Sequence, residues 1–231
     1  MSHPLIVVAW LSLTLAVLST LTVVADLVLD GAQTMWIMNI VWPVTALWAG
    51  PLGLLGYLRY GRAGSRRAAR TAEREHRAPP VRLQPFPILV AKGTSHCGSG
   101  CTVGDLVAEA IAFAFPLTLF GHRLFGVWIY DYALAYLFGI AFQYYTIKPM
   151  QNLSPLEGLW KAIKVDTLSL TAWQIGMFGW MAVVRFAIFG RSLSANDPAF
   201  WLMMQVAMFC GFATSYPVNW WLLRRGIKEA M

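Results

Sequence analysis

Long apolar runs separated by short polar connections dominate the chain from beginning to end. Six of these runs are long enough to cross the hydrocarbon layer of a membrane, about 30 Å thick, as helices. They cover residues 5–26, 35–58, 102–121, 124–146, 164–189 and 199–223. The pattern therefore predicts an all-α integral membrane protein, a bundle of about six transmembrane helices.

Charged residues in the connections predict an orientation for this bundle. The connection 26–34 carries Asp26 and Asp30 and no Lys or Arg, whereas 59–92 carries eight Arg and Lys92. Positive residues collect in cytoplasmic loops, so the first connection is expected outside and the second inside. The same orientation places inside a further set of cations, Lys148, Lys161, Lys164, Arg224, Arg225 and Lys228. We expect both termini in the cytoplasm and a multi-pass protein of the inner (cytoplasmic) membrane.

Three parts follow from these boundaries: a first transmembrane helix pair (1–58), a basic cytoplasmic loop (59–101) and a four-helix transmembrane part (102–231). The loop holds a basic stretch, expected as a short helix or a disordered arm that touches anionic lipid headgroups through Arg66, Arg67, Arg70 and Arg74. Pro43, Gly50 and Pro51 should kink or loosen the second span. Ser154 and Glu157 form a capping-box pattern that should begin a helix near 155.

Composition changes the picture little. The 231 residues are 58% hydrophobic and only 13% charged, too few polar groups to solvate a globular domain, so the lipid bilayer is the expected partner. The net charge of +7 raises the question of nucleic acid, but the cations are confined to loops between apolar spans. No nucleic-acid partner is expected, and a homo-oligomer stays open.

The segment from His96 to Cys101 contains the most distinctive candidate chemistry, since two of the three cysteines and a histidine fall within six residues. Gly98 and Gly100 predict a turn here, directly before a helix with Thr102 as its N-cap. Two thiolates and an imidazole meeting at such a turn suit a soft metal ion, Cu(I) first and zinc less well. The alternative is a tight turn whose cysteines are merely small and apolar.

Ionisable residues inside the spans form a second group of candidates. Asp105 and Glu109 are four apart and share one helix face, and Asp166 is expected at a similar depth. These carboxylates would tune the charge of the site or carry protons. Alternatively, Asp105 only caps its helix and Asp166 lies in the hydrated interface. Asp131 and Arg185 are expected to neutralise each other in the outer half of the bundle.

Methionine is the third candidate group, because thioethers bind Cu(I). Three pairs are spaced three or four apart, so that each pair shares a helix face. They offer steps of a metal path from outside: Met35 and Met38, Met177 and Met181, Met204 and Met208. Met150 is the methionine expected to approach the cysteine motif itself. The alternative is that these residues only fill space between helices.

Three segments together resemble a family of prokaryotic integral membrane proteins, one of the domain-of-unknown-function families. They are the stretch from His96 to Asp105, the stretch from Met35 to Pro43, and the ending Tyr216-Pro217-Val218-Asn219-Trp220-Trp221-Leu222. The resemblance spans most of the chain. It implies a multi-helix membrane protein with a cysteine-rich turn and an association with copper handling, and no catalytic assignment.

The leading hypothesis is a membrane protein that binds Cu(I) at a cytoplasmic-side site built on His96, Cys97 and Cys101, for metal handling or transport. One alternative is a membrane thiol oxidoreductase or metalloenzyme that uses the two cysteines. Another is a phosphate or lipid-headgroup site on the glycine turn, with Lys92 supplying charge. The chain has no nucleotide-binding loop, no hydrolase elbow and no histidine pair for a transmembrane haem. An enzyme is therefore not the leading expectation.

Overall fold

A computed structural model describes residues 3–29, 31–189 and 193–229, and the described part of the chain is helical without a named strand. The elements in chain order are α1 (His3–Leu29), α2 (Met38–Ala49), α3 (Pro51–Gly56), η1 (Tyr57–Gly61), η2 (Arg62–Gly64), α4 (Arg66–Arg74), η3 (Pro80–Leu83), α5 (Phe86–Ala114), α6 (Arg123–Gln151), α7 (Pro155–Val183), η4 (Val184–Ile188) and α8 (Pro198–Arg224). Within these residues, five helices are long and apolar enough to cross a membrane, namely α1, α5, α6, α7 with η4, and α8. The prediction of an all-α, multi-pass membrane protein is confirmed.

Four predicted spans correspond to long helices, and one of the predicted start signals is present in full. The Ser154 hydroxyl accepts a hydrogen bond from the Glu157 backbone N–H, and the Glu157 carboxylate accepts one from the Ser154 N–H at 3.1 Å. This capping box begins α7 at Pro155, which then runs through the fifth predicted span as one helix. Local hydrogen bonding and length thus suffice to define this helix.

The second predicted span is a helical hairpin. Gly50 has a φ of +55°, in the left-handed region that favours glycine, and Pro51 then begins α3. The two arms pack closely, since a Cβ on Gly53 would lie 2.9 Å from the Ala46 Cα atom. The two ends of the hairpin also meet, because the Thr34 N–H donates to the Gly64 carbonyl at 2.9 Å. The chain therefore returns to the end of the bundle from which it entered.

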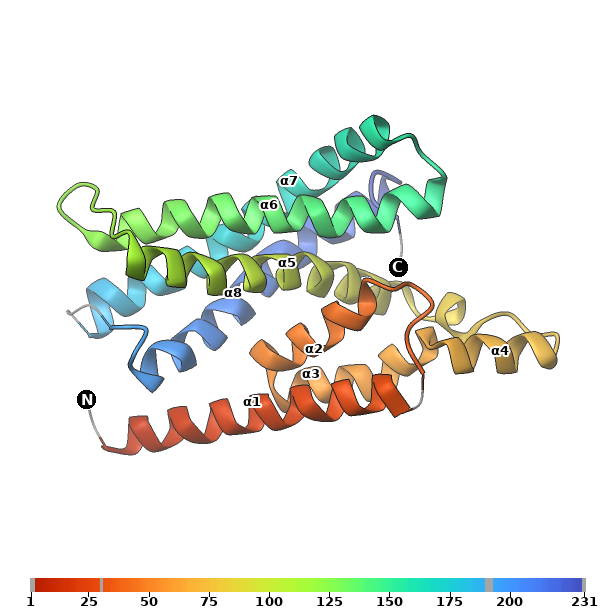
Figure 1. Cartoon of the computed structure of the whole chain (residues 1–231), viewed down its shortest axis with the longest axis horizontal. Helices are drawn as coiled ribbons and strands as arrows, with labels where there is room; N and C mark the ends of the chain where they lie inside the picture. Colours follow the sequence, from red (N-terminus) through yellow and green to blue (C-terminus); the bar gives the residue numbers. More distant parts are fainter. Residues whose placement is uncertain (1–2, 30, 190–192, 230–231) are drawn as a thin grey trace.

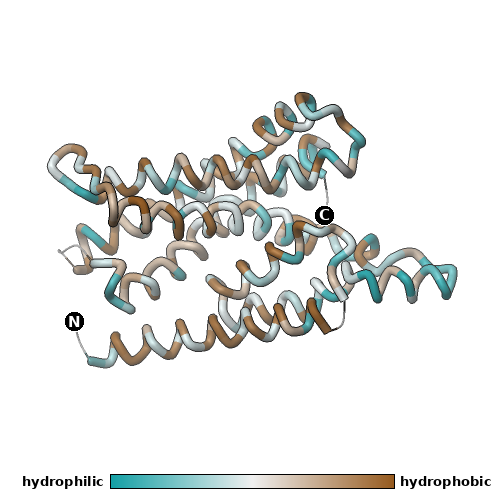
Figure 2. The backbone as a smooth tube through the Cα atoms, viewed as in Figure 1, coloured by the Kyte–Doolittle hydropathy of each residue, from teal (hydrophilic) through white to brown (hydrophobic). Residues whose placement is uncertain are grey.

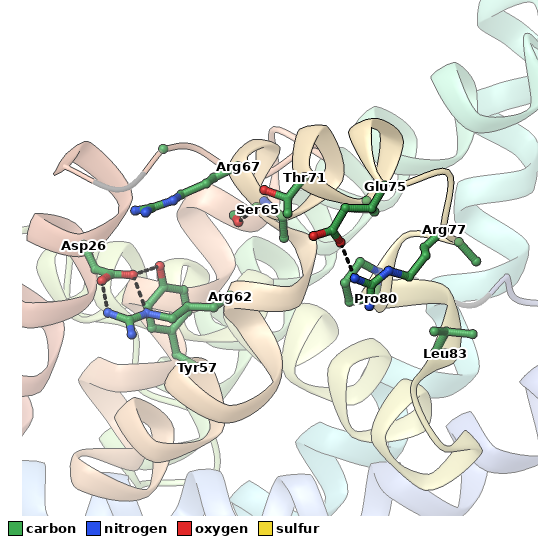
Figure 3. Close-up of a pocket in the computed structure, with 14 residues that line it drawn as sticks. Asp26, Tyr57, Arg62, Ser65, Arg67, Thr71, Glu75, Arg77, Pro80 and Leu83 are labelled. Atoms are coloured by element: carbon green, nitrogen blue, oxygen red, sulfur yellow. Dashed lines mark hydrogen bonds and ion pairs between the residues drawn. The ribbon is translucent and has the colours of Figure 1, made fainter.

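This hairpin takes the place of the single second span that the sequence predicted. Asp26, near the end of α1, forms an ion pair with Arg62 and accepts a hydrogen bond from the Tyr57 hydroxyl at 2.6 Å (Figure 3). The connection that was expected outside and the basic loop expected inside therefore lie at the same end; Asp30 itself lies outside the described residues. As a result, α1 begins and α8 ends at opposite ends of the bundle (Figure 1), whereas the sequence predicted both termini on one side.

The third predicted span is displaced along the chain. The helix expected to begin at 102 begins at Phe86, and it ends at Ala114 rather than near 121. This helix, α5, passes through the middle of the bundle and packs against α6, α7 and α8 (Figure 1). Hydrophilic residues gather on α4 and its flanking connections, which extend beyond the end of the bundle (Figure 2). The boundary expected between residues 101 and 102 thus falls inside the central helix.

Candidate functional site

The cysteine motif is not a turn, because residues 93–102 are continuous helix and all are buried. Its glycines allow helices to approach closely instead. A Cβ on Gly100 would lie 3.0 Å from the Gly139 Cα atom of α6, and one on Gly104 would collide with the backbone of Ala135. Small residues four apart on both helices are the usual basis of tight packing in membranes. The sequence analysis misinterpreted this packing face as a break in the helix.

Trp173 of α7 depends on two further glycines. A Cβ on Gly98 of α5 would overlap the Trp173 ring, and one on Gly211 of α8 would lie 2.7 Å from its indole nitrogen. The ring is fully buried and therefore occupies the space that these glycines leave between α5 and α8. Trp48 of α2 meets the same ring edge to face, with centroids 5.7 Å apart. The two tryptophans therefore pack in the same buried cluster as the two cysteines.

The expected helix start at Thr102 is also absent. The Thr102 hydroxyl donates to the Gly98 carbonyl at 2.7 Å, a bond within the helix, and Asp105 does not reach back to cap anything. The helix dipole and free N–H groups expected beside Cys101 are therefore missing, because the N–H groups here bond to carbonyls one turn earlier. The glycine turn on which a phosphate site was expected is therefore not formed, and the Lys92 ammonium donates to the Gln84 side chain at 3.2 Å.

Cys97 and Cys101 lie one turn apart near the middle of the 29-residue helix α5, not at its mouth. Both are free thiols, buried to 1% and 0% exposure, and their side chains interact electrostatically. They belong to one buried cluster that also contains thioethers from α7 and α8, those of Met177, Met181, Met204 and Met208. Four of the six path methionines thus share a cluster with the thiols. We call Cys97, Cys101 and these four methionines the sulfur cluster.

His96 does not join the two thiols. Its Nε2 atom lies 3.0 Å from the Thr146 hydroxyl of α6, and its ring meets Phe142 edge to face at 5.8 Å. Adjacent residues on a helix point about 100° apart, so the imidazole and the Cys97 thiol face different neighbours. Within the described ranges, no group of three or more His, Cys, Asp or Glu side chains converges as a metal site. The expected three-ligand centre therefore reduces to a pair of thiols.

The remaining candidate methionines lie elsewhere. Met150 is 42% exposed near the end of α6, so it does not approach the buried motif. Met38 belongs to a second buried cluster, formed by α1 and the hairpin, and Met35 packs against that cluster. Met35 and Met38 are separated from the sulfur cluster because the hairpin folds back instead of running through the bundle.

Asp166 lies beside the thiols, together with a cation that the sequence analysis placed only in the C-terminal tail. Asp166 is fully buried next to Cys97, and its Oδ1 atom accepts a hydrogen bond from Gln143 at 3.5 Å. Lys228 is 2% exposed and interacts electrostatically with Cys97 and Asp166. Its ammonium donates to Asn219 at 2.7 Å and to the Gly93 carbonyl at 3.1 Å.

The turn after α8 explains how Lys228 enters the bundle. Gly226 has a φ of +66°, and the next two N–H groups both return to the Leu222 carbonyl, so the chain reverses at the end of the helix. Burial lowers the pKa of the Lys228 ammonium from its ordinary value, and the nearby Cys97 and Asp166 oppose this shift. In the sequence, only Gly226 indicated that the chain turns here after α8. A glycine predicts a turn, but it does not predict that the Lys228 side chain points into the bundle.

A chain of carboxyl groups continues from the thiols toward the other end of the bundle. Asp105 is 3% exposed, and neither of its oxygens has a hydrogen-bond partner, although Gln174 and Glu109 are its neighbours. Asp131 faces Asp105 and Glu109, so its neighbours are carboxyl groups and not the expected Arg185. Cys97, Cys101, Asp105 and Glu109 succeed one another every fourth residue along α5.

Glu109 opens into a cleft of about 370 Å³ at the end where α5 ends and α8 begins. We call this cleft the vestibule; it is lined by Glu109, His122, Arg123, Met181, Arg185 and Phe200 among others. A second cavity of about 230 Å³ lies between α1, α2, α5 and α8, and Glu109, Met204 and Met208 line it. Glu109 lines both spaces. It is also the last member of the stripe Cys97, Cys101, Asp105 and Glu109 on α5, so the stripe leads from the thiols to these two spaces.

Comparison with known proteins gives a family and no activity. The model of a domain of unknown function, DUF4396, matches residues 89–228, which include the sulfur cluster, Asp166 and Lys228. Neither the curated proteins nor the solved structures contain a match to this chain. The matched segment covers more than half of the chain and all of α6, α7 and α8. The chain therefore belongs to the DUF4396 family of domains of unknown function.

Proposed function

We propose that this protein binds Cu(I) between the thiols of Cys97 and Cys101 in the middle of the bundle, as part of metal handling or transport across the cytoplasmic membrane. The observation that carries the proposal is the contact between two buried thiols inside a cluster with four thioethers. Thiolate and thioether are the ligands that favour Cu(I), and two thiolates suffice for a monovalent soft ion. Zinc fits less well, because structural zinc sites need four donors and, among the described residues, no His, Asp, Glu or further Cys joins the two thiols as a third donor.

Met208 is the thioether best supported as an additional ligand. The Thr102 hydroxyl lies 3.9 Å from the Met208 sulfur, which places this sulfur beside α5 directly after Cys101. The Asp166 carboxylate lies next to Cys97 and provides an acceptor for the thiol proton that metal binding must release. The charge-tuning role expected for Asp166 is therefore kept in the proposal, next to Cys97 rather than to Asp105.

The ion approaches the thiols from the vestibule. On that side, Glu109 and Asp105 continue the stripe from Cys101, and Met181, Met204 and Met208 line the vestibule or the adjoining cavity. On the other side, the buried Lys228 ammonium lies between the thiols and the end of the bundle and repels a cation. The proposed route thus leads to the buried thiols from the end at which α8 begins, and it is closed at the end at which α8 terminates.

Metal analysis of the purified protein tests the proposal. The full chain is purified in mild detergent under anaerobic, reducing conditions, loaded with Cu(I), and passed through a desalting column before elemental analysis. We expect about one copper per chain, and loss of that copper in Cys97→Ser and in Cys101→Ser. His96→Ala should retain copper, since its imidazole bonds to α6.

The third cysteine provides a matched control. Cys210 is also a free thiol, but it lies on α8 outside the sulfur cluster, so Cys210→Ser should retain the full amount of copper. Equal copper in wild type and in the Cys97→Ser/Cys101→Ser double variant would exclude the thiol site. Copper lost from Cys210→Ser as well would indicate adventitious binding to thiols.

A second candidate function is thiol oxidation. The position of Asp166 next to Cys97 supports it, because a carboxylate that accepts the thiol proton assists thiolate formation. In that reaction the two thiols give up two electrons and two protons to a quinone-type acceptor, which becomes a hydroquinone, and a disulfide forms. A reversible disulfide between Cys97 and Cys101 in metal-free protein would favour this candidate over copper binding.

We also propose that the end with α4 and the α8 terminus faces the cytoplasm, since nearly all loop cations gather there. The N-terminus then lies outside, and the vestibule opens outward. Fusion of a fluorescent protein and of a periplasmic phosphatase to each terminus tests this orientation. Fluorescence at the C-terminus together with phosphatase activity at the N-terminus is expected, and the reverse pattern would overturn it.

A further inference from the structure

An arginine-rich cleft lies between α4 and the last turn of α1. Its volume is about 680 Å³, and its lining includes Arg66, Arg67, Arg70, Arg74, Val28 and Leu29. Arg66, Arg70 and Arg74 succeed one another every fourth residue, so their guanidinium groups emerge from one side of α4. No Asp or Glu is among the described residues that line the cleft. The cleft therefore gathers the positive charge of Arg66, Arg70 and Arg74 along one side of α4.

The cleft is part of the folded protein and not of a disordered arm. The Arg66 N–H donates to the Ala32 carbonyl at 2.9 Å, which joins the first turn of α4 to the segment after α1. The Ser65 hydroxyl caps α4 by accepting from the Ala68 N–H at 3.1 Å. In Figure 3, Ser65, directly before α4, and Thr71, on α4, lie above the Asp26 and Arg62 pair. These bonds hold the arginines at a fixed place beside α1.

The other wall of the cleft is hydrocarbon. Val28 and Leu29 end the membrane-crossing helix α1 and are 76% and 83% exposed. Side chains of this kind belong at the boundary of the acyl chains, since water is an unfavourable neighbour for them. α4 extends past this end of the bundle (Figure 1), where the lipid headgroups of the same leaflet would lie. Phosphate-binding and hydrocarbon surfaces therefore adjoin within one cleft.

We propose that this cleft binds an anionic phospholipid, its phosphate held by Arg66, Arg70 and Arg74 and its acyl chains packed on Val28 and Leu29. Guanidinium groups pair with phosphate oxygens in a bidentate manner, and each cation near an anionic leaflet adds to the attraction. A free phosphate ion makes no use of the hydrocarbon wall. The site is independent of the sulfur cluster and of the proposed copper binding.

Native mass spectrometry of the delipidated full chain tests this site, with phosphatidylglycerol and phosphatidylcholine as probes. The wild-type protein should bind phosphatidylglycerol selectively. The variant Arg66→Gln/Arg70→Gln/Arg74→Gln should bind it at least about tenfold more weakly, with no change for phosphatidylcholine. Inorganic phosphate in equal amounts should not displace the lipid.

A matched variant distinguishes lipid binding in the cleft from a general effect of positive charge on lipid binding. Arg59→Gln/Arg77→Gln/Arg82→Gln removes the same number of charges from the same connection but none from the cleft, so its lipid affinity should equal that of wild type. Equal weakening of both triple variants, equal binding of the two lipids, or displacement by inorganic phosphate would each overturn the proposal. If the first triple variant does not elute as a monodisperse protein, the single variant Arg70→Gln decides by the same comparison.

Discussion

Helices α1 and α5 are nearly the same length, 27 and 29 residues, yet α1 lies at the periphery of the bundle and α5 lies in its centre. α1 is the more hydrophobic, and its buried residues form a single stripe of five, Ala9, Ala16, Ser19, Val23 and Leu27. α5 buries sixteen residues, most of them glycine, hydroxyl, thiol or charged side chains. In a bilayer, lipid solvates a hydrophobic helix as well as protein does, so small and polar residues decide which helix lies inside.

The chemistry of the molecule follows the same division. The region of α5 to α8 contains the thiols, the buried Asp166 and Lys228, and the stripe of carboxyl groups that leads to the vestibule. The region of α1 to α4 buries aromatic and aliphatic side chains and places its charges at one end, where Asp26 pairs with Arg62. The first region is suited to hold an ion, and the second supports it and contacts lipid. Three experiments test this contrast.

The largest effect is expected where glycine lets α5 touch α6. Gly104→Val places side-chain atoms against the Ala135 backbone, which cannot move aside, so we expect destabilisation of more than about 3 kcal/mol or failure to assemble. Gly179→Val on α7 is the matched control, because nothing lies within 4 Å of a Cβ at Gly179. Heating the detergent-solubilised protein and measuring the monodisperse fraction compares the two. Equal melting would refute the role of close helix contact.

A smaller effect is expected from the electrostatic interaction between the buried Lys228 and Asp166 side chains. Lys228→Met leaves Asp166 buried without a nearby cation, which should cost about 3 kcal/mol. Adding Asp166→Asn removes the unpaired charge and should restore a large part of the loss, so the two changes are not additive. Unfolding followed by tryptophan fluorescence gives the four stabilities of this cycle. Strict additivity would show that the two groups do not interact.

The smallest effect separates lipid-facing from protein-facing leucines. Leu170→Ala on α7 removes a side chain with no exposure and should cost about 2 kcal/mol through the cavity it leaves. Leu21→Ala on α1 removes one that is 58% exposed, and lipid fills the space, so less than about 0.5 kcal/mol is expected. The same thermal assay measures both variants. A larger loss for Leu21→Ala would place α1 inside an interface instead of in lipid.

Helix content was predictable because it depends on local features of the chain. Apolar length marked α1, α6, α7 and α8, and the Ser154 capping box located the beginning of α7 within a residue. The hairpin at Gly50 was expected only as a kink. Proline and glycine indicate where a membrane helix is weak, but whether it bends or reverses depends on what its arms pack against.

The candidate site was predictable in its chemistry and not in its geometry. Cys97, Cys101 and the methionines of α7 and α8 do share one cluster, as the ligand chemistry suggested. Gly98 and Gly100 were interpreted as a turn, although glycines four apart also indicate close helix packing, and Gly100 and Gly104 have that spacing. That alternative would have placed the thiols within a helix, and it would have separated His96 from them.

The sequence by itself determined that this is a helical protein of the membrane, because apolar length and loop charge are properties of single segments. It also determined which soft donors are available for a metal. Only the tertiary structure decided that α5 is central, that α2 and α3 reverse, and that Lys228 returns to Asp166. Each of these depends on which distant surfaces fit together closely, and no local pattern of residues encodes such a fit.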